Sequence, residues 1–185
     1  MMFSQVKDAF ISAIPTQILH TLRGSMFRPM KVFEGLFMAK ERNIVSAKDV
    51  AAEIMRLAGP MTAMKLQKLV YYCQAWSLVW DELPFFNEQI EAWANGPIVP
   101  ELYKIHRGQF EITKWEQGDP SKMKPYQKET IQSVLKFYGD KTGQWLSELT
   151  HQEDPWKNAR EGLAPGERGD KPISHAAMAE YYSSL

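Results

Sequence analysis

The chain has 185 residues, which is enough for one domain of ordinary size with its own hydrophobic core. Hydrophobic residues make up 44% and charged residues 24%, proportions typical of globular proteins, so disorder along the whole chain is not expected. Lys and Arg together number 22, as do Asp and Glu. This balance argues against a protein that mainly grips phosphate backbones, although it leaves room for a local basic patch.

Residues 1–43 differ in character from the rest, with six basic and three acidic residues. They make a poor secretory signal because Pro15 interrupts the apolar stretch, and no apolar run is long enough for a membrane span, so the expected location is the cytoplasm. Apolar strips within 6–14 and 18–22 predict helical segments. Three interpretations stay open: an arm that folds on a partner or membrane surface, a helical pair packed on the domain, and a mis-assigned start with Met38 as the true beginning.

The first marked element of the main domain runs from Ser46 to Gly59. Ser46 is a suitable helix N-cap, and Asp49 places a negative charge in the first turn, where it interacts favourably with the helix dipole. Gly59 and Pro60 then end the segment. The buried face of this helix is predicted to comprise Val50, Ile54, Leu57 and Ala58.

Residues 63–80, capped by Thr62, predict a long central core helix. Its apolar positions recur at helical spacing; they are Leu66, Leu69, Val70, Cys73, Trp76, Val79 and Trp80. Cys73 is the only cysteine, which excludes an intrachain disulfide and a thiolate metal cluster. Its place on the apolar face indicates an inert thiol rather than a nucleophile. Lys65 and Lys68 are assigned to the solvent face.

A small β element is predicted next. Residues 86–94 lose the helical spacing and alternate like a short strand, and 110–115 form a second possible strand. We expect the two to pair as a ribbon around an intervening helix that starts at Pro100. Asn95 and Gly96 form a tight corner between the first strand and this helix, where positive φ costs little.

The C-terminal third predicts helices with clear ends. Pro125 opens one that Gly139 ends, and Asp154 and Pro155 open a short one as cap and first residue. After a loop, Ser174 caps the last helix. The apolar positions of the first two C-terminal helices are Ile131, Val134, Leu135, Tyr138, Trp145, Leu146 and Leu149.

These elements together predict a mainly α fold with a small β element (α+β). The expected arrangement is a compact helical domain over residues 44–185, built around one central apolar helix, with an N-terminal helical extension over residues 1–43.

Three stretches occur in an order that resembles the Panacea domain, also called the SocA-like antitoxin domain. They are AGPMTAMKLQKLVYYCQAW (58–76), IEAWANGPIVPELYKIHRG (90–108) and LSELTHQEDPWKNAR (146–160). The residues that match the family motifs are Gly59, Pro60, Met61, Thr62, Leu66, Gln67, Lys68, Leu69, Tyr71, Tyr72, Trp76, Trp93, Gly96, Pro97, Val99, Pro100, Tyr103, Thr150, His151, Pro155 and Trp156. The resemblance covers about residues 44–185.

The resemblance implies a protein encoded in bacteria, prophages or other mobile elements, often beside a toxin gene. Many Panacea proteins are antitoxins that neutralise a cognate toxin by direct protein contact, and their partners belong to unrelated toxin classes. The family has no established catalytic centre, so we expect no enzymatic activity, cofactor or metal. A role as an adaptor that delivers the toxin to a protease is a second hypothesis within the same class.

Two other classes of function compete with this interpretation. His151 lies beside Glu153 and Asp154 and could act as a general base, yet its place at the end of a helix explains it as a cap. The helix with Lys65 and Lys68 could belong to a helix-turn-helix unit of a DNA-binding regulator. Its surface carries Leu, Val, Tyr, Cys and Trp instead of the side chains that read bases, which argues against nucleic acid as the main partner.

The stiff corner at 95–97 predicts a preformed aromatic surface. Because Trp and Tyr bury large areas with little loss of entropy, they serve well as interface anchors; alternatively, Trp93 only fastens the ribbon to the core. The residues predicted to contact a toxin are Trp93, Tyr103 and Tyr72, with Lys68, Glu91, His106 and Arg107 at the rim. We expect occlusion of a toxin surface, and a strand edge that accepts a partner strand is a further possible mode.

Overall fold

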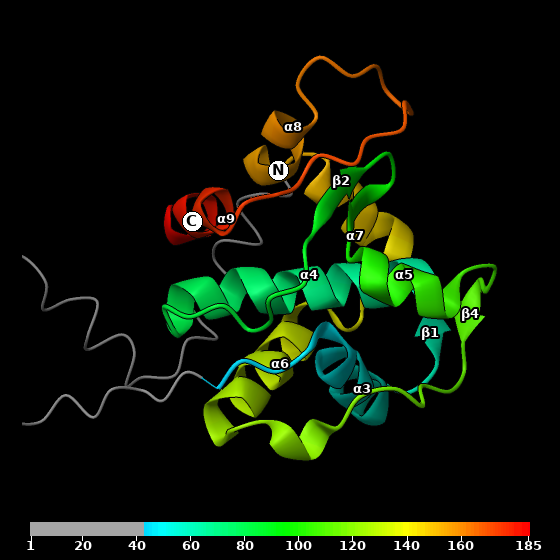
Figure 1. The fold of residues 1–185 in the computed structure, drawn as a ribbon, viewed down its shortest axis with the longest axis vertical. Coiled ribbons are helices and arrows are strands. Elements are labelled where there is room, and N and C mark those ends of the chain that lie inside the picture. Colours follow the sequence, from blue (N-terminus) through cyan, green and yellow to red (C-terminus); the bar gives the residue numbers. More distant parts are fainter. Residues whose placement is uncertain (1–42) are drawn as a thin grey trace, which may run out of the picture. The chain divides into compact units, whose positions relative to one another are not determined.

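The structure, a computed structural model, describes residues 43–185, which form one compact unit. The predictions for the N-terminal extension, including its two helical strips and its role as an arm, lie outside the described residues. Within residues 43–185 there are seven α-helices and two small antiparallel strand pairs (Figure 1). The prediction of a mainly α fold with a small β element is therefore confirmed.

The described residues form the following helices and strands. The helices are α3 (Ala47–Ala58), α4 (Ala63–Trp80), α5 (Pro100–His106), α6 (Pro125–Tyr138), α7 (Gly143–Thr150), α8 (Asp154–Ala159) and α9 (His175–Ser183), with a 3₁₀ helix, η1 (Pro120–Lys122). The strands are β1 (Met61–Thr62), β2 (Glu91–Trp93), β3 (Gly96–Ile98) and β4 (Glu111–Ile112). Among these helices none combines the length and the apolar character that crossing a membrane requires.

Helix α4 is the core of the domain, as predicted. It packs against α3, α6, α7 and α9, and Figure 1 shows it running through the middle of the described unit. Every residue from Leu66 to Ser77 is buried, which is the pattern of a helix enclosed on all sides. The assignment of Lys68 to a solvent face is wrong, because its side chain is fully buried. Lys65 is half-buried, and its Nζ donates a hydrogen bond to the Gly139 carbonyl at 2.7 Å.

Most predicted helix boundaries are confirmed. Ser46 and Asp49 form a capping box, in which Ser46 N donates to Asp49 Oδ2 at 2.8 Å and the Ser46 hydroxyl accepts from Asp49 N. Thr62 and Ser174 cap α4 and α9 through their hydroxyls. Gly59 follows α3 at φ 72°, a left-handed conformation that suits glycine.

Three positional predictions are wrong. Leu57 is 39% exposed and Ala58 is also exposed, because the neighbours of α3 leave its last turn uncovered. Leu135 in α6 is only half-buried. Helix α8 has Glu153 at its N-cap, and Asp154 is its first helical residue. The Glu153 side chain makes no capping hydrogen bond, because it turns into the core instead.

The strands pair differently from the prediction. β2 forms a hairpin with β3, with Trp93 opposite Gly96, and β1 pairs with β4. The expected ribbon between 86–94 and 110–115 is not formed, because the corner after β2 turns the chain straight back on itself and α5 then returns β4 to the start of α4. The outer edge of β2 is also occupied, since Ala92 N donates to Lys171 O at 2.9 Å and Ile173 N donates to Ile90 O at 2.8 Å.

Buried polar side chains of α4 hold the irregular chain that follows it. Gln74 Oε1 accepts from the backbone N–H groups of Phe85 and Phe86, both at 3.0 Å, and its amide nitrogen donates to Phe86 O at 3.3 Å. Ser77 Oγ donates to Leu83 O at 2.8 Å. Among the described residues no strand pairs with the backbone of residues 83–86, and these side chains supply hydrogen-bond partners for it instead.

A buried carboxyl group joins three helices in the core. Glu153, at the start of α8, accepts hydrogen bonds from Tyr72 of α4 at 3.1 Å and from Tyr182 of α9 at 2.6 Å. The Tyr182 hydroxyl also lies 3.3 Å from that of Tyr71. Burial raises the pKa of Glu153 to about 8, so the protonated carboxyl is the favoured form in the folded state near neutral pH.

Replacing Glu153 with Gln should remove a pH dependence of stability. Because burial raises the pKa of Glu153 from 4.5 to about 8, its stabilising contribution is complete below about pH 4.5 and is lost as the pH rises toward 8. Urea unfolding across this range should show wild type losing stability relative to Glu153→Gln, with a slope of at most about 1.4 kcal/mol per pH unit. Parallel pH profiles for the two proteins would contradict the assignment.

Candidate functional site

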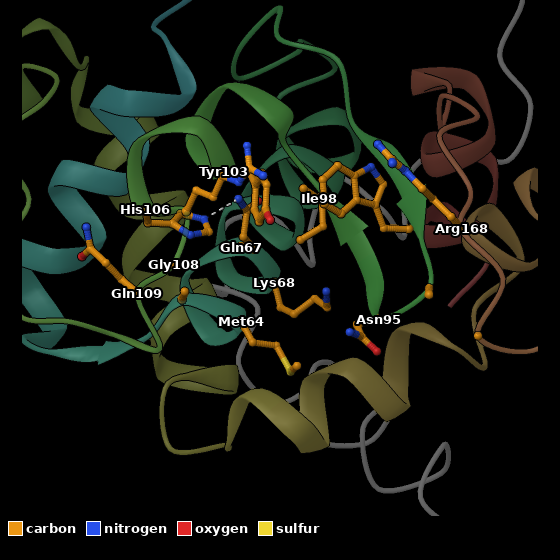
Figure 2. Close-up of a pocket in the computed structure, with 15 residues that line it drawn as sticks. Met64, Gln67, Lys68, Asn95, Ile98, Tyr103, His106, Gly108, Gln109 and Arg168 are labelled. Atoms are coloured by element: carbon orange, nitrogen blue, oxygen red, sulfur yellow. Dashed lines mark hydrogen bonds between the residues drawn. The ribbon is translucent and has the colours of Figure 1, made fainter.

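A pocket of about 560 Å³ lies where α4, the β2–β3 hairpin, α5 and the loop 163–172 come together (Figure 2). This volume is in the range of sites that hold a small molecule or several protein side chains. Five of the seven residues that the sequence predicted as toxin contacts line it: Lys68, Trp93, Tyr103, His106 and Arg107. The fold therefore brings together residues that span about forty positions of the sequence.

The other two predicted contacts do not line the pocket. Tyr72 is fully buried in the cluster around Glu153, so its assignment to a preformed aromatic surface is wrong. Glu91 is half-buried and has a supporting position, because its Oε2 accepts a hydrogen bond from Trp93 Nε1 at 2.7 Å. It thereby fixes the orientation of the indole ring.

Two aromatic side chains form one wall of the pocket. The rings of Trp93 and Tyr103 meet edge to face, with centroids 4.8 Å apart and planes at 65°. The Trp93 backbone carbonyl accepts a hydrogen bond from Trp156 Nε1 at 2.9 Å. Both aromatic residues are half-buried, so each is held in place and still presents part of its surface.

Gln67 sets the geometry of a second wall. Its Oε1 accepts from Val99 N at 2.8 Å and its Nε2 donates to Val99 O at 3.2 Å, which ties the start of α5 to α4. Its Nε2 also lies 2.9 Å from His106 Nε2, a contact drawn in Figure 2. Because the amide nitrogen can only donate, His106 Nε2 must accept, and the imidazole is neutral. Burial also lowers the pKa of His106.

Lys68 lies in the floor of the pocket, and the prediction that it belongs to the rim is wrong. Its side chain is fully buried, and its Nζ donates to Pro97 O at 3.1 Å, the one hydrogen bond found for it within residues 43–185. No carboxylate in this part of the chain forms an ion pair with it. Burial lowers the pKa of Lys68 to about 7.

Gly96 leaves the space that the Lys68 side chain occupies. A Cβ atom at this position would lie 2.6 Å from Lys68 Cε and 2.7 Å from Thr150 Oγ1. Gly96 also has φ 97°, which L-residues rarely adopt. The predicted corner is confirmed as a place of positive φ, and the glycine has the further role of admitting a lysine.

Arg160, which sequence reasoning missed, fixes the loop that completes the pocket. Its guanidinium donates to Ala92 O at 2.9 Å and to Glu167 O at 2.6 Å, and it lies over the Trp156 ring at 5.2 Å. It thereby joins the hairpin to the loop that carries Arg168, a lining residue. Its partners are backbone carbonyls, which leave no signal in a sequence.

The arrangement that would support acid–base chemistry at His151 is not formed. His151 is the C-cap of α7, as predicted, and its ring stacks on Trp156 with centroids 4.1 Å apart. Glu153 is bound by tyrosines and Asp154 pairs with Lys157 at 2.6 Å, so neither carboxylate orients the imidazole. Within the described part of the chain, no group of three His, Cys, Asp or Glu residues is placed to hold a metal ion.

The geometry also gives little support to three other hypotheses, which are a nucleophilic Cys73, a DNA-reading α4 and a β2 edge that accepts a partner strand. Cys73 is buried, as expected, and burial raises the pKa of its thiol. A DNA-reading role for α4 would require an exposed helix face, whereas α4 is enclosed by four other helices. The β2 edge is occupied by residues 171–173, so it does not offer a free strand to a partner.

Substituting Gly96 with Ala should destabilise the domain more than the same change at Gly108. Both glycines have positive φ, so both variants pay the conformational cost of about 1–2 kcal/mol. Only the Cβ at Gly96 would meet other atoms, because nothing lies within 4 Å of that at Gly108. Urea unfolding should show at least about 2 kcal/mol more loss for Gly96→Ala. Equal losses would mean that the site accommodates a methyl group.

Replacing Lys68 with Met should stabilise the protein at pH 6. Burial lowers the pKa of Lys68 from 10.5 to about 7, so the stability it contributes is complete above about pH 10.5 and is lost as the pH falls through 7. Lys68→Met removes this cost and should gain about 1–4 kcal/mol at pH 6, with a smaller gain near pH 10. The control Lys65→Met loses only a hydrogen bond, about 1 kcal/mol. A destabilised Lys68→Met protein at pH 6 would contradict the uncompensated burial of this amine.

Comparisons with known proteins bear on the same region. Residues 66–157 match the family model described as Antitoxin SocA-like, Panacea domain. The matched segment begins within α4 and ends within α8, so it contains Gln67, Lys68, the hairpin and α5. No curated protein and no solved structure matches the chain. Residues 66–157 are therefore identified as a Panacea domain of the SocA-like antitoxin type.

Proposed function

We propose that this protein is an antitoxin that neutralises a cognate protein toxin by binding it directly at the pocket, and that the toxin is encoded by the adjacent gene. Membership of the SocA-like family suggests an antitoxin role and a protein partner. The observation that carries the proposal is the fixed pair of half-buried aromatic rings, Trp93 and Tyr103, beside the pocket.

The two rings have the properties of interface anchors. Trp93 is held at its indole nitrogen by Glu91 and at its backbone carbonyl by Trp156, so binding costs it little conformational entropy. Tyr103 is fixed against Trp93 and also meets the His106 ring edge to face at 5.6 Å. A partner side chain that enters the pocket would pack against rings that are already in position.

Binding at this place would act by occlusion. A pocket with fixed walls and an exposed mouth can hold a projecting segment of the toxin, and the bulk of the domain then covers the surrounding toxin surface. This mechanism requires no chemical step from the antitoxin. A site built on the core helix α4 suits this mechanism, because the packed core gives the pocket a constant shape for binding the toxin.

Co-expression with the adjacent open reading frame tests the proposal. The wild-type chain should restore growth and co-purify with the toxin. Trp93→Ala and Tyr103→Ala should each weaken the complex by about 2 kcal/mol or more, because anchor residues dominate interface energies, and should reduce protection. Growth assays and pull-down through a tag on this chain measure both effects.

A matched control is Trp145→Ala, which removes a half-buried indole from α7, away from the pocket. It should leave protection and the complex intact. Full protection by folded Trp93→Ala and Tyr103→Ala proteins would contradict binding at the pocket. Protection that depends on loss of the toxin through a cellular protease would instead assign the adaptor role.

A further inference from the structure

The pocket has a charge that differs from that of the whole chain. The chain carries equal numbers of acidic and basic residues. The 15 residues that line the pocket include no Asp or Glu and three cationic residues, Lys68, Arg107 and Arg168. Such one-sided lining is the mark of a site for a negatively charged ligand.

The three cations occupy different depths. Arg107 and Arg168 are exposed, so water already solvates them at the mouth. Lys68 is fully buried, and its amine has three N–H groups when protonated but bonds only to Pro97 O among the described residues. A buried charged amine with unused N–H donors destabilises the folded state unless a ligand accepts hydrogen bonds from it.

We propose that the floor of this pocket binds a carboxylate of the partner protein, which pairs with the Lys68 amine while neighbouring acidic residues of the partner face Arg107 and Arg168. The proposal rests on the proposed antitoxin function for the identity of the partner as a protein. The carboxylate itself is inferred from the pocket alone.

The depth of the cations favours a carboxylate over a phosphate. A single buried ammonium balances one negative charge, which a carboxylate carries. A phosphate group near neutral pH carries more charge and more acceptor oxygens, and it would call for further buried donors of the guanidinium type. The two arginines stand at the mouth, where they suit additional acidic side chains spaced along a protein segment.

A ligand would reach the Lys68 amine by passing side chains that can change conformation. Met64 is half-buried and Asn95 is exposed, and both line the pocket on either side of Lys68 in the view of Figure 2. A Met side chain is unbranched and adapts readily to a ligand. We expect movement of these two side chains to open the floor while the backbone, which Gln67 and Gly96 hold in place, keeps its position.

Among the described residues that line the floor of the pocket, Lys68 is the one that carries a charged group. His106 of α5 is neutral because it accepts from Gln67, and burial lowers the pKa of His151 at the C-cap of α7. Thr150 contributes a hydroxyl, which donates to Ser147 O at 2.8 Å. A bound carboxylate would therefore hold the Lys68 amine in its charged form and raise its pKa.

The test uses two small probes that differ only in charge. N-acetyl-glutamate N-methylamide carries a single side-chain carboxylate, and N-acetyl-glutamine N-methylamide carries its neutral isostere. Binding to the full chain is followed by NMR titration, observing the Lys68 side-chain signals. We expect the glutamate probe to bind about tenfold or more tightly than the glutamine probe, because a hydrogen bond to a charged group adds that much. It should also raise the pKa of Lys68.

Variants locate the interaction. Lys68→Met should abolish the preference for the glutamate probe, whereas Lys65→Met, on the same helix but outside the pocket, should keep it. The double change Arg107→Gln with Arg168→Gln removes the cations from the mouth. Both side chains are exposed and lie outside the core, so the variant should stay folded and should reduce glutamate binding by a smaller factor than Lys68→Met. Equal binding of the two probes, or an undiminished preference in Lys68→Met, would overturn the proposal. Inorganic phosphate binding at Lys68 in place of the glutamate probe would overturn it in favour of a phosphate ligand.

The same variants separate this inference from the proposed function. If Lys68→Met loses the probe preference and also loses protection against the toxin, both stand. If the wild type prefers glutamate but never protects cells, the anion site stands and the antitoxin function fails. If Lys68→Met still protects fully and still prefers glutamate, the carboxylate site fails while the antitoxin function stands.

Discussion

The enclosure of helix α4 is the constraint on which the rest of this domain depends. A helix buried on all sides must find a partner inside the protein for every polar group it carries. Gln67, Gln74 and Ser77 meet this requirement by binding the backbone of the segment 83–99, and they thereby shape a stretch that has little regular structure of its own. Lys68 is the member of the series whose bonding capacity remains partly unused, and the pocket lies next to it.

Features governed by local chemistry were predicted well from the sequence. Caps such as Ser46 and Thr62, the length of α4 and the positive φ at Gly96 depend on residues within a few positions of one another. The stiff corner at 95–97 suggested the grouping of Lys68 with Trp93 and its neighbours. These residues meet in space because α5 brings the chain back toward α4. The start of α5 at Pro100 was also predicted from the sequence.

The failures share a physical cause, which is that long-range contacts decide them. Lys68 was placed in solvent because lysine is rarely buried, and only the packing of four helices around α4 reverses that expectation. The strand partners depend on where loops bring the chain back. Arg160 bonds to a carbonyl 68 residues away, and Glu153 to hydroxyls 81 and 29 residues away, so no local pattern marks either residue.

The loop 163–172 is closed at both of its ends. Arg160 ties one side to the hairpin and to Glu167, and the pairing of Lys171 with Ala92 ties the other. Gly166 lies in the turn that Glu167 N closes on Ala164 O at 3.1 Å, and a Cβ atom there would meet no other atom within 4 Å. Because the entropy of closing a loop grows only slowly with its length, residues can be added or removed around Gly166 at small cost to folding. Such changes in length would reshape the entrance of the pocket and leave its floor untouched, which makes this loop a place to graft new specificity in protein engineering.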